Sequence, residues 1–143
     1  MSQPLSDSPS HGLVASHVSV TDRAGHVIVD DVSVHARPRR TLVIVGESGA
    51  GKSMLARTLC ALTPSALSAS GTVSLGGEDY DLATDQGRLK KQRGGGIVWL
   101  PQDPFTSLAP TIRCAKQVTA ARTGRRSERA QRSRALLAEV GLD

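Results

Sequence analysis

The chain has 143 residues, of which 38% are hydrophobic and 2% aromatic, and its net charge is +5. No apolar run approaches the roughly 20 residues of a membrane helix, and the Ser- and Pro-rich start lacks the basic and apolar regions of a signal peptide, so we expect a cytoplasmic protein. The basic excess is compatible with a nucleic-acid partner, but the near absence of stacking aromatic side chains argues against one.

The first third of the chain predicts an antiparallel β layer. Residues 1–12 are expected to form a disordered lead-in. Valines alternate loosely with polar residues over 13–20, which predicts a half-buried strand, and a turn at 23–25 leads to a second valine-rich strand over 27–34. The run 41–45 is apolar on both faces, which is typical of a strand buried inside a parallel sheet.

A helix is expected after residue 51, because apolar residues recur at helical spacing as far as Leu62. Pro64 ends this helix, since proline disfavours the helical conformation at the residue before it. The elements expected next are a strand over 71–75, a short helix over 84–93 and an apolar strand over 97–100.

The last predicted element is a helix from about Glu128, with Ser127 as its cap. Gly141 is the expected C-terminal stop of this helix. The stretch 122–134 is rich in arginine. It could face anionic lipid or a membrane protein, but a solvated helix face is the interpretation we favour.

Residues 46–53 read Gly-Glu-Ser-Gly-Ala-Gly-Lys-Ser, which fits the phosphate-loop (P-loop) pattern completely. Its glycines let the backbone turn tightly and aim N–H groups at phosphate oxygens, helped by the positive end of the following helix. We expect Lys52 to reach the β and γ phosphates of ATP and the Ser53 hydroxyl to ligate Mg²⁺. The predicted nucleotide-binding residues are Gly46, Glu47, Ser48, Gly49, Ala50, Gly51, Lys52, Ser53 and Met54.

The alternative for residues 46–53 is a plain glycine-rich turn. The buried strand expected before the loop and the helix expected after it favour the P-loop. Gln102 is a second candidate, in the run Leu100-Pro-Gln-Asp-Pro104. A glutamine at a strand end is ordinarily a surface amide. Its amide oxygen could also ligate Mg²⁺ or orient a water, and the residues alone leave both interpretations open.

Three segments together resemble the ATP-binding subunits of ABC transporters. They are residues 45–53, 100–110 and 136–142, and the resemblance covers most of the chain from Leu13 onward. The Gly-Glu-Ser-Gly-x-Gly-Lys-Ser loop and the Pro-Gln-Asp-Pro-x-x-Ser-Leu-x-Pro run are similar, more narrowly, to the oligopeptide, dipeptide and nickel importer branch.

The resemblance implies an α/β fold, a P-loop NTPase core of ABC type with an N-terminal antiparallel β layer. Residues 13–100 would form that part, and residues 101–143 would hold the Q-loop and the start of a helical subdomain. Gln102 would be the Q-loop glutamine that touches Mg²⁺ and the attacking water, and with Lys52 it would be catalytic.

The implied function is to couple ATP binding and hydrolysis to transmembrane transport, as in peptide or nickel import. The implied partners are transmembrane permease subunits, a second ATPase subunit and, indirectly, an extracytoplasmic solute-binding protein. The implied location is the cytoplasmic face of the cell membrane.

The chain departs from the family pattern in several places. The sequence shows no Leu-Ser-Gly-Gly signature, Walker B strand, catalytic Glu or switch His. We reject the Val27–Asp31 run as Walker B, because it precedes the P-loop. The adenine-stacking aromatic usual near Ala24 or Gly25 is also missing. We therefore expect an N-terminal piece of an ABC ATPase, incomplete in fold, that binds Mg-ATP weakly and does not hydrolyse it.

Two other functions remain open from the sequence. One is a small-molecule kinase, in which the arginine-rich stretch 122–134 would form a lid over phosphates, and the Q-loop match argues against it. The other is a non-catalytic nucleotide-binding module or decoy that pairs with a permease or a full-length ATPase.

Overall fold

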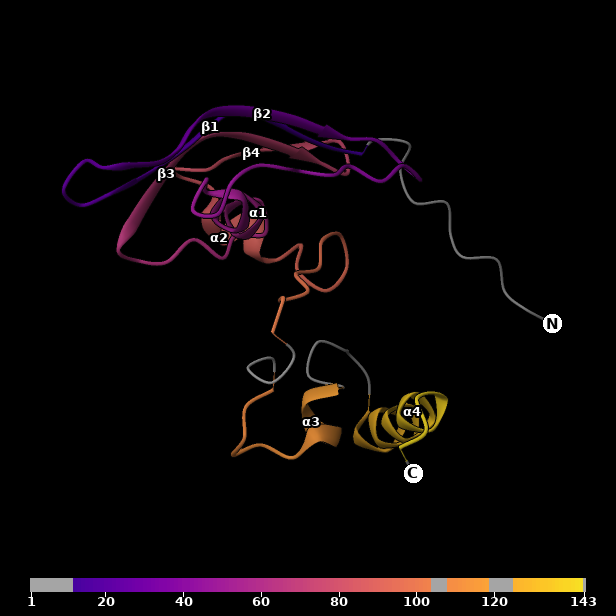
Figure 1. The fold of residues 1–143 in the computed structure, drawn as a ribbon. Helices are drawn as coiled ribbons and strands as arrows, with labels where there is room; N and C mark the ends of the chain where they lie inside the picture. Colours follow the sequence, from indigo (N-terminus) through magenta and orange to yellow (C-terminus); the bar gives the residue numbers. More distant parts are fainter. Residues whose placement is uncertain (1–11, 104–107, 119–124, 143) are drawn as a thin grey trace. The chain divides into compact units, whose positions relative to one another are not determined.

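The computed structural model describes residues 12–103, 108–118 and 125–142, and the predicted lead-in falls almost entirely outside this set. The chain divides into two compact units, residues 1–99 and 100–143. Figure 1 shows the elements of each unit, which are β1 (Leu13–Asp22), β2 (Val27–Ala36), α1 (Lys52–Leu59), β3 (Leu67–Leu75), β4 (Glu78–Asp81) and α2 (Gln86–Lys90) in the first, and α3 (Cys114–Val118) and α4 (Arg126–Glu139) in the second. None of the helices in the described part is long and apolar enough to cross a membrane.

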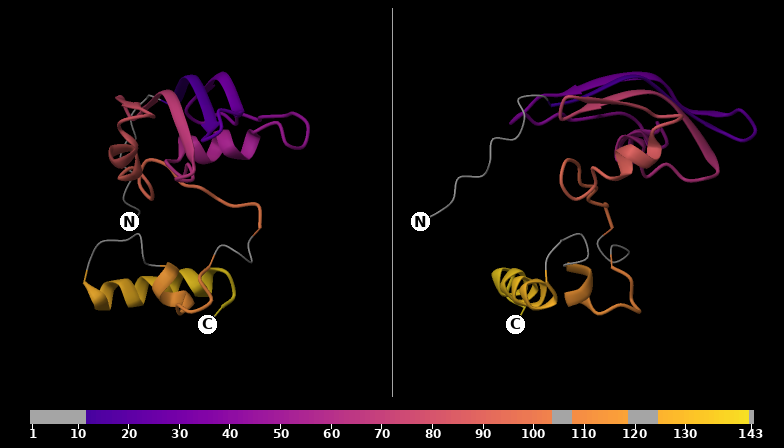
Figure 2. Two further views of the ribbon diagram at one scale, coloured as in Figure 1. Left: turned by 90° about the vertical axis from the view of Figure 1, so that its left-hand side faces the viewer. Right: turned by 180° about the vertical axis from the view of Figure 1, so that it is seen from behind.

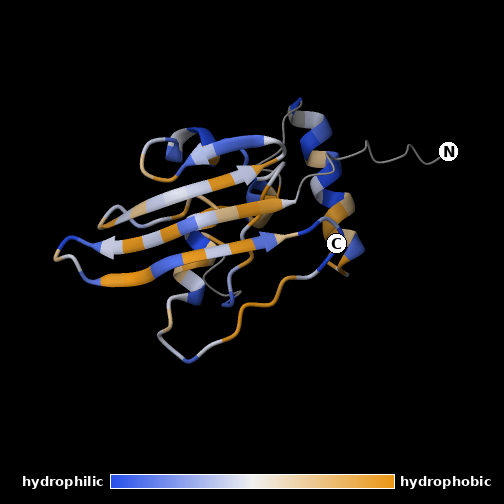
Figure 3. Ribbon diagram, turned by 90° about the horizontal axis from the view of Figure 1, so that it is seen from above, coloured by the Kyte–Doolittle hydropathy of each residue, from blue (hydrophilic) through white to orange (hydrophobic). Residues whose placement is uncertain are grey.

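The first unit is built on a four-stranded antiparallel sheet in the order β2-β1-β3-β4. This confirms the two predicted strands over 13–20 and 27–34 and their antiparallel pairing. Hydrophobic and hydrophilic residues are interspersed along β1, β2 and β3 (Figure 3), as expected of a sheet that buries one face, whereas β4 is hydrophilic.

A bulge explains why the alternation in β1 is loose. Ala15, Val18 and Val20 are all buried, although the first two lie an odd number of residues apart. The register of β1 against β2 shifts between Ala15 and Val18, where His17 adopts φ 54°. One inserted residue returns the apolar side chains to the core face.

α1 and α2 lie on the same side of the sheet (Figure 2). Together with that face they enclose a core of aliphatic side chains and one tyrosine. The buried members of this core are Ala15, Val18, Val20, Val29, Leu55, Leu59, Val73, Tyr80, Leu82 and Leu89. Tyr80 is 1% exposed, and its hydroxyl donates a hydrogen bond to Glu78 and accepts one from Gln92.

α1 ends well before Pro64. The chain leaves the helix through Ala61, which has φ 53°, and the N–H of Leu62 donates to the carbonyl of Arg57 over 2.8 Å. This is the hydrogen bond of a Schellman motif, in which glycine usually occupies the left-handed position. Here an alanine holds it.

The β1–β2 hairpin is closed by the Asp22 side chain. Its carboxylate accepts hydrogen bonds from the backbone N–H groups of Ala24 and His26 at 2.8 and 2.9 Å, and it lies 2.9 Å from His26 Nδ1. The hydrogen bonds from His26 hold the pKa of Asp22 below its ordinary value of 3.8.

Several predicted boundaries were wrong. β3 begins at Leu67 rather than at residue 71, and α2 is limited to Gln86–Lys90. α4 begins at Arg126, and the predicted Ser127 cap is wrong, because the Glu128 carboxylate accepts instead from the N–H of Arg125 over 3.1 Å. β4 and α3 were not predicted. The Gly141 stop is confirmed, with φ 75°.

The two predicted apolar strands, 41–45 and 97–100, were wrong. No strand in the described part of the chain pairs with either run, apart from an isolated bridge between Arg93 and Ile97. Val43 and Val45 are 71% and 84% exposed. Both runs have the composition of buried strands, but a strand forms only where a neighbour completes its hydrogen bonds.

In the second unit, α4 contacts α3. Ser133 of α4 is buried, and its hydroxyl donates to the carbonyl of Ala115 over 3.1 Å. The Gln117 side chain of α3 holds the preceding turn through hydrogen bonds to Ala109 and Ile112.

Candidate functional site

The predicted phosphate loop leads directly into α1. Gly49 and Gly51 have φ 85° and 77°, in the left-handed region that glycine adopts without a steric penalty. α1 begins at the next residue, Lys52. The sequence therefore forms a sharp turn that ends at a helix N-terminus, as the pattern predicts.

Gly51 is also required by a close approach to the sheet. A Cβ atom on this residue would lie 2.4 Å from the carbonyl oxygen of Ile28 and 3.1 Å from a methyl group of Val29. By contrast, a Cβ on Gly49 would have no atom within 4 Å. The loop is thus pressed against β2 at its last glycine and stands clear of the protein at its middle one.

The Lys52 side chain folds back along the loop. Its Nζ donates to the carbonyl of Gly46 over 2.8 Å and also to the carbonyl of Glu47. These bonds use two of its three N–H donors. The ammonium group is therefore held against the start of the loop with one donor left, and the Ser53 side chain next to it in the chain is exposed.

The first turn of α1 adds free backbone donors. An α-helix cannot pair its first N–H groups internally, and within the described residues nothing accepts a hydrogen bond from the N–H groups of Lys52, Ser53 or Met54. The first turn carries no acidic residue, so the partial positive charge of the helix end is not neutralised there. This set of donors suits the oxygens of a phosphate chain.

A hollow of about 470 Å³ adjoins the loop. It is lined by Ile28, Val29, Asp30, Val32, Ile44, Val45, Gly49, Ala50, Gly51, Lys52 and Leu55. Sequence reasoning missed that Asp30 lies beside the loop, and no spacing signal could have found it, because the contact joins segments far apart in the chain. The described residues contain no group of three or more His, Cys, Asp or Glu side chains that could hold a metal ion.

Gln102 belongs to the second unit, where it is exposed. The structure brings Lys52 and Ser53 together at the start of α1, in the first unit. The contact of Gln102 with the nucleotide therefore stays a prediction.

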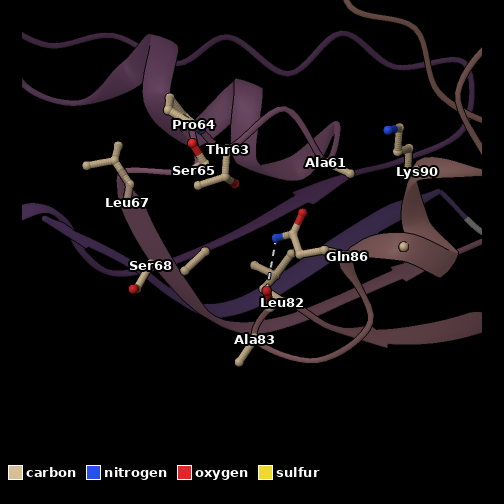
Figure 4. Close-up of a pocket in the computed structure, with 12 residues that line it drawn as sticks. Ala61, Thr63, Pro64, Ser65, Leu67, Ser68, Leu82, Ala83, Gln86 and Lys90 are labelled. Carbon is tan, nitrogen blue, oxygen red and sulfur yellow. Dashed lines mark hydrogen bonds between the residues drawn. The ribbon is translucent and has the colours of Figure 1, made fainter. Parts of the chain in front are cut away.

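Another hollow, of about 510 Å³, lies where the end of α1 and the start of β3 face α2 (Figure 4). Its lining is small and weakly polar, and Lys90 is the one charged side chain among the lining residues. Gln86 points into it but donates its side-chain N–H to the carbonyl of Leu82 over 2.9 Å. No residue of the phosphate loop lines this hollow, so we do not include it in the candidate site.

Comparison with known proteins decides the family. A protein-family model described as ABC transporter matches residues 29–143. The chain belongs to the ABC transporter family. Its fold is therefore that of a P-loop NTPase with the antiparallel sheet described above at its N-terminal side, and ABC family membership implies nucleotide binding.

Several similar curated proteins are named as ATP-binding proteins of import or transport systems. The chain is 40% identical over 111 residues to a protein of Brucella abortus (strain 2308) named "Putative peptide import ATP-binding protein", which covers 74% of this chain and 33% of the relative. It is 39% identical over 105 residues to the dipeptide transport ATP-binding protein of Lactococcus lactis subsp. cremoris, covering 71% and 30%. It is 30% identical over 107 residues to the metal-staphylopine import system ATP-binding protein of Staphylococcus aureus, covering 74% and 39%.

The chain spans about a third of the length of these relatives. The ABC family resemblance inferred from the phosphate loop and the Q-loop segment is thus confirmed. The aligned residues do not show what this chain transports or which partners it binds.

Proposed function

We propose that residues 1–143 bind ATP with Mg²⁺ through the phosphate loop, as part of the ATP-binding subunit of an ABC importer. The observation that supports this best is the donor set at the start of α1. The Lys52 ammonium and the open N–H groups of the first helical turn converge on one concave loop. Mg²⁺ would supply positive charge to the phosphate oxygens, and the exposed Ser53 hydroxyl is its proposed ligand.

The proposed cargo is a peptide or nickel, by analogy with the peptide, dipeptide and metal-chelate import named for the relatives. The proposed partners are transmembrane permease subunits and a second ATPase subunit, with a solute-binding protein acting indirectly, at the cytoplasmic face of the membrane. Gln102 is proposed to contact Mg²⁺ and the attacking water.

Nucleotide titration of the whole chain tests the binding proposal. We expect K52A to weaken binding of an ATP analogue at least about tenfold, because each hydrogen bond to a charged group contributes about 1.5–3 kcal/mol. K91A removes an exposed lysine outside the loop and should bind as the parent does. S53A should bind the analogue with less dependence on Mg²⁺. Equal affinity for K52A and K91A would contradict the proposal.

A non-catalytic nucleotide-binding module is the second candidate. The absence of a Walker B motif from these 143 residues favours it for this stretch of chain taken alone. Binding without turnover is the expected result. Steady-state hydrolysis at about 1 s⁻¹ or faster, which is within the ordinary enzyme range, would rule this candidate out.

A further inference from the structure

The largest of the three hollows described here lies away from the phosphate loop, at the opposite end of β2. Its volume is about 720 Å³, within the range of small-molecule sites. It is bounded by the end of β2 with the turn that follows, the start of β1 and the β3–β4 turn, at the right-hand end of the sheet in Figure 1. Nothing in the proposed nucleotide site uses it.

A row of four paired residues crosses the sheet under this hollow. Val14 pairs with His35 on one side and with Ser74 on the other, and Ser74 pairs with Asp79. Directly paired residues project to the same face of a sheet. Ala15, next to Val14, is buried in the core, so this row lies on the face opposite the core.

The turn after β2 brings two arginines to the same hollow. Arg40 N–H donates to the carbonyl of Arg37 over 3.2 Å, and a turn closed in this way holds the first and fourth Cα atoms within about 7 Å. Both arginines line the hollow, but Arg39 between them does not. Within the described part of the chain, no carboxylate forms an ion pair with Arg37 or Arg40.

The hollow therefore carries opposite charges at its two sides. Arg37 and Arg40 lie at the β2 side, and Asp79 lies on β4, hydrogen-bonded to the Ser74 hydroxyl. Three interstrand spacings separate β2 from β4, which is about 14 Å. Val14 provides an apolar floor between the two sides.

We propose that this hollow binds a short zwitterionic peptide in an extended conformation. The terminal carboxylate would pair with Arg37 and Arg40, since a guanidinium group matches a carboxylate with two parallel hydrogen bonds. The terminal ammonium would pair with Asp79. An extended chain spans about 3.3–3.6 Å per residue, so the spacing between β2 and β4 suits a peptide of about four residues.

The first test titrates tetra-alanine and its two blocked forms into the whole parent chain. Acetylation removes the peptide's positive charge, and C-terminal amidation removes its negative charge. We expect each blocked form to bind at least about tenfold more weakly than tetra-alanine, because each loses a charged hydrogen-bonding partner. Equal binding of all three forms, or no binding of tetra-alanine, would overturn the proposal without any mutation.

Variants then assign the direction of the peptide. The double variant R37Q/R40Q should bind tetra-alanine and its amide equally, because it removes both arginines that line the hollow, and D79N should bind tetra-alanine and its acetylated form equally. The matched controls are R39G, which removes a charge outside the hollow and relieves φ 56° at that residue, and E78Q on the neighbouring position of β4. Both controls should still bind tetra-alanine more tightly than its blocked forms. If R39G or E78Q lost this preference as well, the assignment of the two charged ends would be refuted. Binding of the ATP analogue should be the same in all four variants, so failure here is distinguishable from failure of the nucleotide site.

Discussion

The contact between the phosphate loop and the sheet predicts a large difference between two glycine substitutions in the same loop. Both Gly49 and Gly51 have left-handed φ values, so alanine at either position costs about 1–2 kcal/mol of backbone strain. At Gly51 the new Cβ would also lie 2.4 Å from the carbonyl oxygen of Ile28. Forcing backbone apart at such a contact adds about 1–3 kcal/mol.

We therefore expect G51A to lower the free energy of unfolding by roughly 2–5 kcal/mol, and G49A by about 1–2 kcal/mol. Urea unfolding followed by far-UV circular dichroism measures both, and the fluorescence of the single Trp99 provides an independent probe. Because both variants share the same backbone strain, their difference isolates the contact with β2. Equal losses in the two variants would refute the reasoning, since the loop would then not be pressed against the sheet.

Three further predictions follow from the described residues. A61G should raise the free energy of unfolding by about 1 kcal/mol, because glycine removes the left-handed strain at the end of α1. An unchanged urea midpoint would count against that account. The hydrogen bonds from His26 lower the pKa of Asp22 below 3.8 in the folded chain, so this carboxylate stabilises the fold above that pH and loses the effect as acid protonates it. D22N should accordingly flatten the fall in stability below pH 3.8, and an acid-unfolding curve identical to the parent's would contradict this. We expect the 143-residue chain to aggregate, and V45K should raise its solubility while changing stability by less than about 0.5 kcal/mol, because Val45 is 84% exposed. Sedimentation and urea unfolding measure the two effects, and a monomeric parent chain would contradict the first.

The features that the sequence predicted correctly are those set by local pattern. The valines of β1 and β2 alternate because one face of each strand is buried, and the bulge at His17 explains the break in that alternation. The phosphate loop and the start of α1 follow from glycine, lysine and serine within eight residues. Gly141 ends α4 because glycine enters the left-handed conformation without strain.

The features that the sequence did not predict depend on partners distant in the chain. An apolar run such as 41–45 indicates a segment suited to burial, but it does not specify which strand pairs with it. β4 was missed because it is short and mostly polar, with Tyr80 as its one buried side chain. The Ile28 contact with Gly51 was equally invisible, since it joins two segments that no spacing rule connects.

The unpaired run 41–45 has a consequence for how tightly the phosphate loop can hold a nucleotide. The loop is followed directly by α1, which fixes its C-terminal side. Residues 41–45, which precede the loop, form no interstrand hydrogen bonds in the described part of the chain. Ordering a backbone residue costs about 1–2 kcal/mol, so any strand that pairs with this run removes part of the entropy lost when phosphate binds. Strand pairing therefore raises the affinity for the nucleotide by some factor. By thermodynamic linkage, bound nucleotide favours that strand pairing by the same factor. Assembly of the sheet and occupancy of the loop are in this sense one coupled equilibrium.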